Sequence, residues 1–145
     1  MNIPAILADP AALVHRLCAA TNAHDLDAVA ACFSPDYRNE TPAHPERDFV
    51  GRDQVRSNWS QIFAAIPDVT TEVLRVCVDG DAAWSEWEHR GTRQDGSAHL
   101  MRGVVIFGVP DDCAAWARFY LEPVEVAAGG VNEAVRRQVL PGAPR

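Results

Sequence analysis

The side chains best suited to acid–base chemistry in this sequence are two histidines, His89 and His99, and the closely spaced pair Tyr37 and Asn39. An imidazole near its usual pKa both accepts and donates protons at neutral pH, so His89 is the first candidate for proton transfer. A phenol and a carboxamide polarise a substrate oxygen or orient a water molecule. If these residues share a pocket, they predict chemistry on an oxygen-containing small molecule.

Each of these residues also has a purely structural interpretation. His89 could be a buried histidine bonded to the backbone or to Tyr37, and His99 could be solvated at a cavity mouth. Tyr37 and Asn39 could brace the loop that follows them. Catalysis requires that Tyr37, Asn39 and His89 converge on an open cavity, whereas the structural interpretation requires no cavity.

Two helices are predicted before Tyr37. Asp9 is a suitable N-cap followed by proline, which gives a helix to about Asn22. Asp25 caps a second helix, which ends where residues 34–36, Ser-Pro-Asp, break the chain.

A loop and a third helix are predicted next. Residues 42–48 contain two prolines and no periodicity, so we expect a loop that covers a pocket mouth. The third helix follows Gly51 and ends at Pro67. Its buried stripe recurs at helical spacing and comprises Val55, Trp59, Ile62, Phe63 and Ile66.

From Val69 the apolar pattern changes to the period of two that is typical of strands. Short turns separate the candidate strands, so consecutive strands are expected to pair antiparallel. The predicted strands span residues 72–78, 82–93, 98–109 and 115–124. We therefore predict an α+β domain over residues 1–127, followed by a tail (residues 128–145) in which Val131, Val135 and Val139 could form a short helix.

The hairpin at Asp95-Gly96 decides which strand residues share a face, because a one-residue change in loop length flips the relative faces. A two-residue loop sets His89 opposite Arg102. A three-residue loop pairs Arg93 with Ser97 and sets Glu88 opposite Arg102, and we favour it because opposite charges attract across strands.

In that register the strands have two contrasting faces. One face resembles a pocket wall, on which the mid-strand Gly103 leaves room for a ligand. That face presents Ser85, Trp87, His89, His99, Met101, Gly103, Val105 and Phe107. The other face presents Trp84, Glu86, Glu88, Arg102, Val104 and Ile106. With Tyr120 it suits a homodimer interface, or a solvated rim around a small apolar centre.

Composition excludes several functions. The net charge of -7, with no basic cluster, argues against nucleic acid as a partner. No apolar run approaches a membrane span and no secretory signal is recognisable, so we expect a cytoplasmic protein that is not bound to a membrane.

The four cysteines lie in apolar surroundings and are expected in the core. No carboxylate or cysteine joins the histidines on the pocket face, and no glycine-rich phosphate loop occurs, so neither a metal nor a cofactor is predicted.

Four segments carry a resemblance to a known superfamily: residues 22–27 (Asn-Ala-His-Asp-Leu-Asp), 33–37 (Phe-Ser-Pro-Asp-Tyr), 51–53 (Gly-Arg-Asp) and 118–122 (Arg-Phe-Tyr-Leu-Glu). In order and spacing they resemble the SnoaL-like branch of the nuclear-transport-factor-2-like superfamily. The resemblance covers roughly residues 9–125. It implies a cone-shaped barrel, with three N-terminal helices packed on a curved, mainly antiparallel sheet, and a dimer through the outer sheet face.

The functional residues of these relatives are only partly present. The acid–base and tyrosine positions of ketosteroid isomerases correspond to Thr41, Gly103 and Leu17, so that chemistry is not expected. Tyr37 and Asn39 match the water-holding pair of limonene-epoxide-hydrolase-like enzymes. The strand motif of those enzymes aligns with Trp87 and His89, and their water-activating aspartate aligns with Phe119.

We therefore predict a cofactor-independent enzyme that performs cyclisation, isomerisation, dehydration or epoxide opening on a small, apolar, oxygenated substrate. The predicted catalytic residues are His89, Tyr37 and Asn39. The predicted substrate-binding residues are Trp59, Phe63, Trp87, His99, Met101 and Phe119. Glu122, or Glu86 and Glu88, would supply the acid if their face turned inward. A non-catalytic binding protein, a dimeric accessory protein and a protein-interaction module are the alternatives.

Overall fold

The structure is a computed structural model that describes residues 8–126 and 129–142. Three helices precede most of the strands: α1 (Pro10–Asn22), α2 (Leu26–Ala31) and α3 (Arg52–Ala65). Aspartates begin the first two as predicted, because Asp9 Oδ1 accepts from Ala12 N and Asp25 Oδ1 accepts from Ala28 N, each at 3.1 Å.

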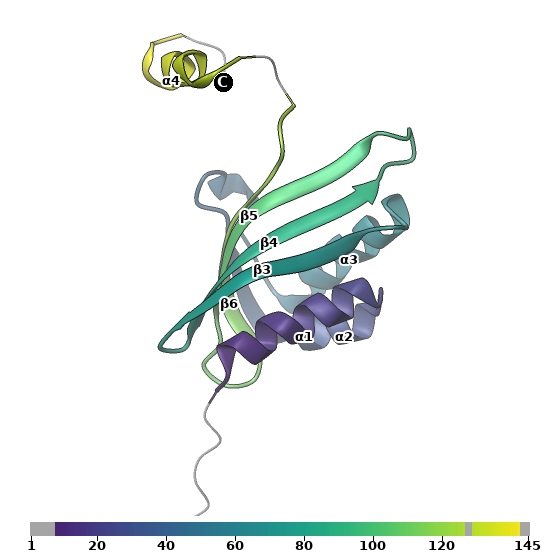
Figure 1. Cartoon of the computed structure of the whole chain (residues 1–145). Coiled ribbons are helices and arrows are strands. Elements are labelled where there is room, and N and C mark those ends of the chain that lie inside the picture. The colour runs from purple at the N-terminus through teal and green to yellow at the C-terminus, as the bar shows by residue number, and fades with distance from the viewer. Residues whose placement is uncertain (1–7, 127–128, 143–145) are drawn as a thin grey trace, which may run out of the picture.

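A six-stranded, curved and unclosed sheet forms the rest of the domain (Figure 1). Its strands are β1 (Phe33–Glu40), β2 (Phe49–Val50), β3 (Thr70–Asp79), β4 (Ala82–Thr92), β5 (Ala98–Gly108) and β6 (Ala114–Pro123). The spatial order is β2-β1-β6-β5-β4-β3. Strands β3 to β6 form the predicted antiparallel meander, while β1 pairs parallel to β6.

One predicted break lies within a strand. Residues 34–36 were expected to interrupt the chain, but they belong to β1, which begins at Phe33. The register of β1 against β6 shifts between Phe33 and Arg38. Regular pairing therefore resumes only beyond Pro35, and a proline is tolerated where a ladder is irregular.

The Asp95-Gly96 hairpin has the three-residue loop that the charge pattern favoured. Arg93 N donates to Ser97 O at 2.9 Å, and Gly96 has a left-handed φ of 84°. Glu88 is accordingly opposite Arg102, and His89 is opposite Met101.

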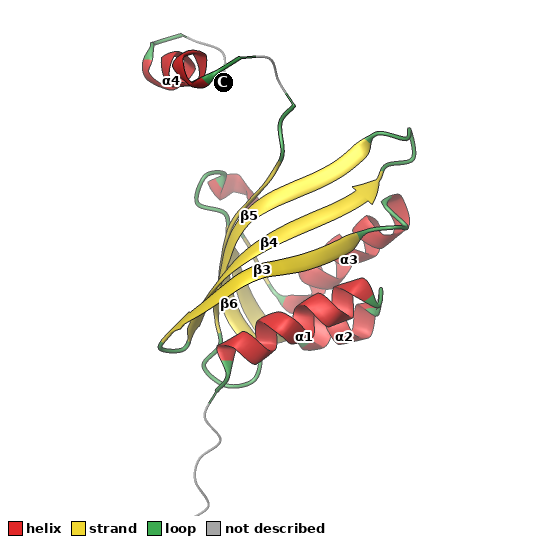
Figure 2. Cartoon of the chain, in the orientation of Figure 1, coloured by secondary structure: helices red, strands yellow, loops and turns green. Residues whose placement is uncertain are grey.

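Helices α1, α2 and α3 cover the concave face of the sheet (Figure 2). The core lies between them, and its largest fully buried side chains include Leu13, Val14, Tyr37 and Phe107. The prediction that all four cysteines are core residues is wrong. Cys32 is buried, but Cys77 is exposed because it pairs with Trp84 on the convex face of the sheet.

Beyond β6 the chain forms α4 (Val131–Val139), which stands apart from the sheet and the other helices in Figure 1. Its side chains are exposed, including Val131 and Val139. Among the helices of the described residues, none is long and apolar enough to cross a membrane.

Candidate functional site

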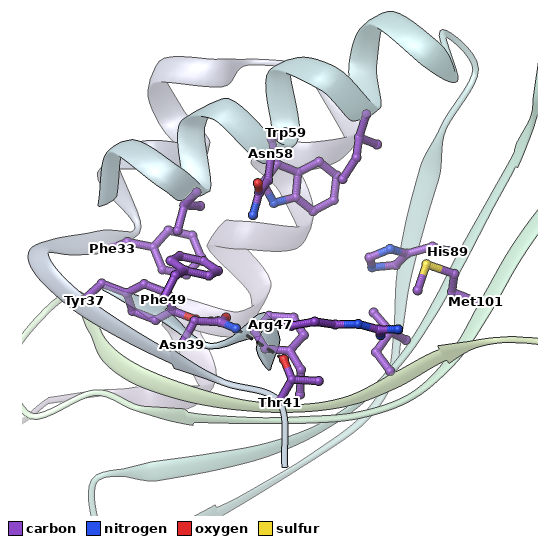
Figure 3. Close-up of a pocket in the computed structure, with 14 residues that line it drawn as sticks. Phe33, Tyr37, Asn39, Thr41, Arg47, Phe49, Asn58, Trp59, His89 and Met101 are labelled. Atoms are coloured by element: carbon purple, nitrogen blue, oxygen red, sulfur yellow. Dashed lines mark hydrogen bonds between the residues drawn. The ribbon is translucent and has the colours of Figure 1, made fainter. Parts of the chain in front are cut away.

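A cavity of about 280 Å³ lies between α3 and the concave face of the sheet (Figure 3). Its wall is mainly apolar, with a few polar groups contributed by β1, the loop after it, α3 and β4. The lining residues are Phe33, Tyr37, Asn39, Thr41, Arg47, Phe49, Val55, Asn58, Trp59, Ile62, His89, Met101, Phe119 and Leu121. An apolar wall with a few polar side chains is typical of small-molecule sites.

A smaller cavity of about 40 Å³ shares part of this wall. Both cavities are bounded by Phe33, Trp59, His89, Phe119 and Leu121. The smaller one reaches the apolar core at Leu17, Trp87, Val105 and Phe107. His89 therefore lies where the two spaces meet.

The larger cavity brings together most of the residues that the sequence nominated. Tyr37, Asn39 and His89, from β1 and β4, all line it. So do three of the six predicted substrate-binding residues, namely Trp59, Met101 and Phe119.

The other three nominated residues lie elsewhere. Trp87 lines the smaller cavity. Its Nε1 donates to Ser85 Oγ at 2.8 Å, and this bond holds the indole in the apolar core. Phe63 lines neither cavity and stacks on His24, with ring centroids 4.6 Å apart. His99 also lines neither and is half-buried opposite Gly91, near the end of the hairpin.

The imidazole of His89 is nearly enclosed, with 8% of the residue exposed. Trp59 and Trp87 flank it, each with its ring centroid 5.8 Å away. Within the described residues its ring nitrogens have no hydrogen-bond partner, and no fully buried side-chain nitrogen or oxygen is unpaired. Both nitrogens are therefore accessible from the cavity.

Burial determines the charge of His89. Desolvation, with a smaller contribution from His99, lowers the pKa of His89 to about 4. The sequence suggested an imidazole near its usual pKa. The structure instead keeps this side chain neutral at pH 7, with one ring nitrogen free to accept a proton.

Tyr37 and Asn39 form a hydrogen-bonded pair inside the cavity. Tyr37 Oη donates to Asn39 Oδ1 at 2.8 Å, and Asn39 Nδ2 has a longer contact of 3.5 Å to Thr41 Oγ1. Burial raises the pKa of Tyr37 well above its ordinary value, so the phenol keeps its proton. The second amide N–H group of Asn39 therefore remains for a ligand in the cavity.

Gly103 does not make room in the cavity, contrary to the expectation from sequence. A Cβ at this position would lie 2.1 Å from Tyr120 O, and the residue has a φ of 154°. The absent side chain therefore permits close approach of β5 to β6.

The acids that could have replaced His89 point away from the site. Glu86 and Glu88 lie on the convex face, where Glu88 Oε2 accepts from Arg102 Nε at 2.8 Å. Glu122 is paired with His44 at 3.1 Å. In the described part of the chain, no aspartate or glutamate lines either cavity.

Several lining residues were not nominated from the sequence. Thr41 directly precedes the predicted loop over the pocket mouth, and Arg47 lies within that loop. Their position next to the predicted mouth was the only sequence signal that could have nominated them as lining residues. Asn58 precedes Trp59 on α3, so the helical stripe placed it close to the site. Phe49 belongs to a two-residue strand that is too short to show a pattern. Among the residues the structure describes, no group of three or more histidine, cysteine, aspartate or glutamate side chains could hold a metal ion.

Comparison with known proteins identifies the family. The sequence profile of the SnoaL-like domain matches residues 14–130, which is most of the chain. The protein therefore belongs to the SnoaL-like family. No curated protein matches the sequence significantly.

Solved structures share the fold at low sequence identity. IdmH from Streptomyces antibioticus, a proposed polyketide cyclase, is 20% identical with a TM-score of 0.69, covering 79% of this chain and 92% of that one. An epoxide hydrolase from M. tuberculosis, similar to limonene epoxide hydrolase, is 17% identical with a TM-score of 0.66. The match covers 77% of this chain and 80% of that one. A proposed ketosteroid isomerase from Kribbella flavida is 21% identical with a TM-score of 0.63. The match covers 92% of this chain and 89% of that one. These similarities support the cone fold predicted from sequence.

Proposed function

We propose that this protein is a cofactor-independent enzyme that performs acid–base catalysis on a small, apolar, oxygenated substrate. The observation that carries the proposal is the position of His89. Its imidazole is neutral, unpaired within the described residues and accessible from a cavity that Tyr37 and Asn39 also line. The accessible position and the neutral form of His89 support this role, because a general base needs a free nitrogen within reach of the substrate.

The proposed step is removal of a proton from a carbon next to a substrate carbonyl. The free ring nitrogen of His89 accepts the proton, the C–H bonding pair forms the enolate C=C bond, and the carbonyl π pair moves onto oxygen. The N–H group of Asn39 that is not directed at Thr41 donates to that oxygen as its charge develops. Tyr37 acts through Asn39, because its hydroxyl holds the amide oxygen and so orients the amide nitrogen.

The protonated His89 then returns its proton. Delivery to a different carbon completes an isomerisation, and delivery to a leaving hydroxyl completes a dehydration. In a cyclisation, the enolate carbon attacks a second carbonyl and the proton goes to the new alkoxide. Burial makes the imidazolium a strong acid, which favours this return. Epoxide opening fits less well, because none of the described residues that line the cavity is a carboxylate able to activate water.

A hydrogen–deuterium exchange assay tests this proposal, because exchange at the α-carbon is visible whichever product forms. Apolar cyclic enones and β-keto lactones are incubated with the protein in deuterated buffer, and loss of the α-proton signal is followed by NMR. We expect exchange with the wild type and loss of exchange with His89→Gln. Exchange that persists in a folded His89→Gln variant would falsify the proposed role of His89.

A second candidate function is binding without turnover. Two observations favour it: Tyr37 and Asn39 are already bonded to each other, and an imidazole with a pKa of about 4 is a weak base. This alternative predicts saturable ligand binding with no exchange and no product.

We also propose that the protein forms a homodimer through the convex face of the sheet. Trp84 on β4 and Tyr120 on β6 are 49% and 43% exposed there, on the two strands that flank β5. Large aromatic side chains are enriched at protein interfaces. Sedimentation at several concentrations tests this proposal, and a monomer throughout the micromolar range contradicts it.

A further inference from the structure

The polar groups of the larger cavity are mostly hydrogen-bond donors. Two carboxamides line it, and the oxygen of each is already occupied: Asn39 Oδ1 accepts from Tyr37, and Asn58 Oδ1 accepts from Gln54 Nε2 at 2.8 Å. Each amide nitrogen carries two N–H groups and no acceptor, and one N–H group of Asn39 is directed at Thr41 Oγ1 at 3.5 Å. The bonds that fix these side chains therefore leave N–H donors for a ligand.

The cavity also contains a cation without a carboxylate. Arg47 lines it, and within the described residues its guanidinium makes no ion pair. In Figure 3 the Arg47 side chain extends across the pocket from the side of Asn39 toward that of Met101. A guanidinium remains charged at all relevant pH values. The net charge of the chain is -7, so a cavity with a positive charge and no acidic lining residue contrasts with the rest of the molecule.

The loop that carries Arg47 is held in place by its own contacts. Thr41 N donates to Asp48 Oδ1 at 2.7 Å, which closes the loop at its base. Arg47 N donates to His44 O at 2.9 Å within the short 3₁₀ helix Pro45–Arg47. His44 Nε2 lies 3.1 Å from Glu122 Oε1 and thereby fastens the loop to β6. The backbone thus positions Arg47 at the cavity mouth before a ligand arrives, which lowers the entropic cost of binding.

We propose that the ligand of this cavity is an apolar molecule that carries a carboxylate, which Arg47 binds at the mouth. The inference rests on the proposed function, because it specifies the substrate class of the same site. A guanidinium fork matches the two oxygens of a carboxylate and forms charge-assisted hydrogen bonds. Asn58 contributes N–H donors from the α3 side of the cavity. The apolar body of the ligand extends inward to Trp59, Phe119 and Leu121, and places its carbonyl near Asn39 and His89.

A matched pair of ligands tests the inference. Calorimetry compares 2-naphthoate with 2-naphthamide, which have nearly the same shape but differ in charge, at pH 7.5 and low salt. We expect the wild type to bind the naphthoate roughly tenfold more tightly than the amide. Arg47→Gln should abolish this preference by weakening naphthoate binding about tenfold more than naphthamide binding, and Arg47→Lys should retain part of it.

Arg38→Gln is the control, because Arg38 is exposed on the opposite face of β1 and the substitution removes the same charge. It should preserve the preference. Equal affinity of the wild type for the two ligands, or an unchanged preference in Arg47→Gln, overturns the carboxylate inference and leaves the proposed function intact. If neither ligand binds at millimolar concentration, the carboxylate inference is wrong, and the α-proton exchange assay alone decides the proposed function.

Discussion

Glu88 and His89 are neighbours on β4 and are equally buried, each with 8% of the residue exposed, yet they occupy opposite faces of the sheet. The pKa of each is lowered, for opposite reasons. Arg102 and Arg90 hold Glu88 in its charged form through hydrogen bonds. Desolvation holds His89 in its uncharged form. The convex face therefore satisfies its polar groups by ion pairing, and the concave face leaves an imidazole unpaired but neutral.

This difference indicates where chemistry is feasible. A carboxylate with two arginine partners has no free capacity to exchange protons, so Glu88 is structural. A neutral imidazole with accessible nitrogens can accept a proton from a ligand. Four predictions test the contrast between the two faces.

The largest expected effect is on proton transfer. His89→Gln should reduce α-proton exchange at least about 100-fold, because it removes the general base. Glu88→Gln, one residue away on the other face, should leave exchange unchanged. The NMR assay measures both variants, after circular dichroism has established that each is folded. Similar losses in both variants would indicate that the faces do not differ in function.

The second prediction concerns stability against pH. The folded pKa of His89 is about 4 and its unfolded value is near 6.5, so the unfolded state binds more protons between these values. His89 therefore supports the fold fully above pH 6.5, and this contribution is lost as pH falls toward 4. By linkage, the wild type should lose about 2–3 kcal/mol of unfolding free energy from this residue by pH 4.5.

Urea unfolding of the wild type and His89→Gln at pH 7.5 and 4.5 measures this contribution of His89 to the unfolding free energy. The contribution should be missing in the variant. Glu88 has a lowered carboxyl pKa, so its contribution is present above its unfolded pKa and is lost only at lower pH. Glu88→Gln should therefore show the same fall in unfolding free energy between pH 6.5 and 4.5 as the wild type. An equal slope in the wild type and His89→Gln would show that His89 is not kept neutral by burial.

The third prediction concerns the proposed dimer. Trp84→Arg should raise the dimer dissociation constant at least about thirtyfold, which corresponds to roughly 2 kcal/mol for an aromatic residue central to an interface. Exchange activity should persist in the monomer, since Trp84 does not line the cavity. Analytical ultracentrifugation measures the dimer dissociation constants of the wild type and the variant. An unchanged dissociation constant in Trp84→Arg would place the interface elsewhere.

The smallest effect distinguishes the two tyrosines of the chain. Tyr37→Phe should destabilise the protein by about 1–2 kcal/mol, because Asn39 Oδ1 loses its donor in a buried site. Tyr120→Phe should have no measurable effect on stability, since Tyr120 is 43% exposed on the convex face. Thermal unfolding of the two variants side by side gives this difference, and equal destabilisation would contradict it.

The sequence by itself determined the local architecture. Asp9 and Asp25 identified the first two helix starts, since capping depends on a few adjacent residues. The alternation of polar and apolar residues located β3 to β6, and the charges of Glu88 and Arg102 selected the hairpin register that placed His89 on the concave face. Tyr37, Asn39 and His89 could therefore be nominated together from residue type and strand register.

Tertiary structure alone decided what surrounds those residues. The lowered pKa of His89 arises from burial between Trp59 and Trp87, which come from different elements. The contribution of Arg47 depends on how its loop folds back onto β6, and the effect of Gly103 depends on the approach of another strand. Desolvation, loop closure and strand contact join residues far apart in the chain, so no local sequence pattern records them.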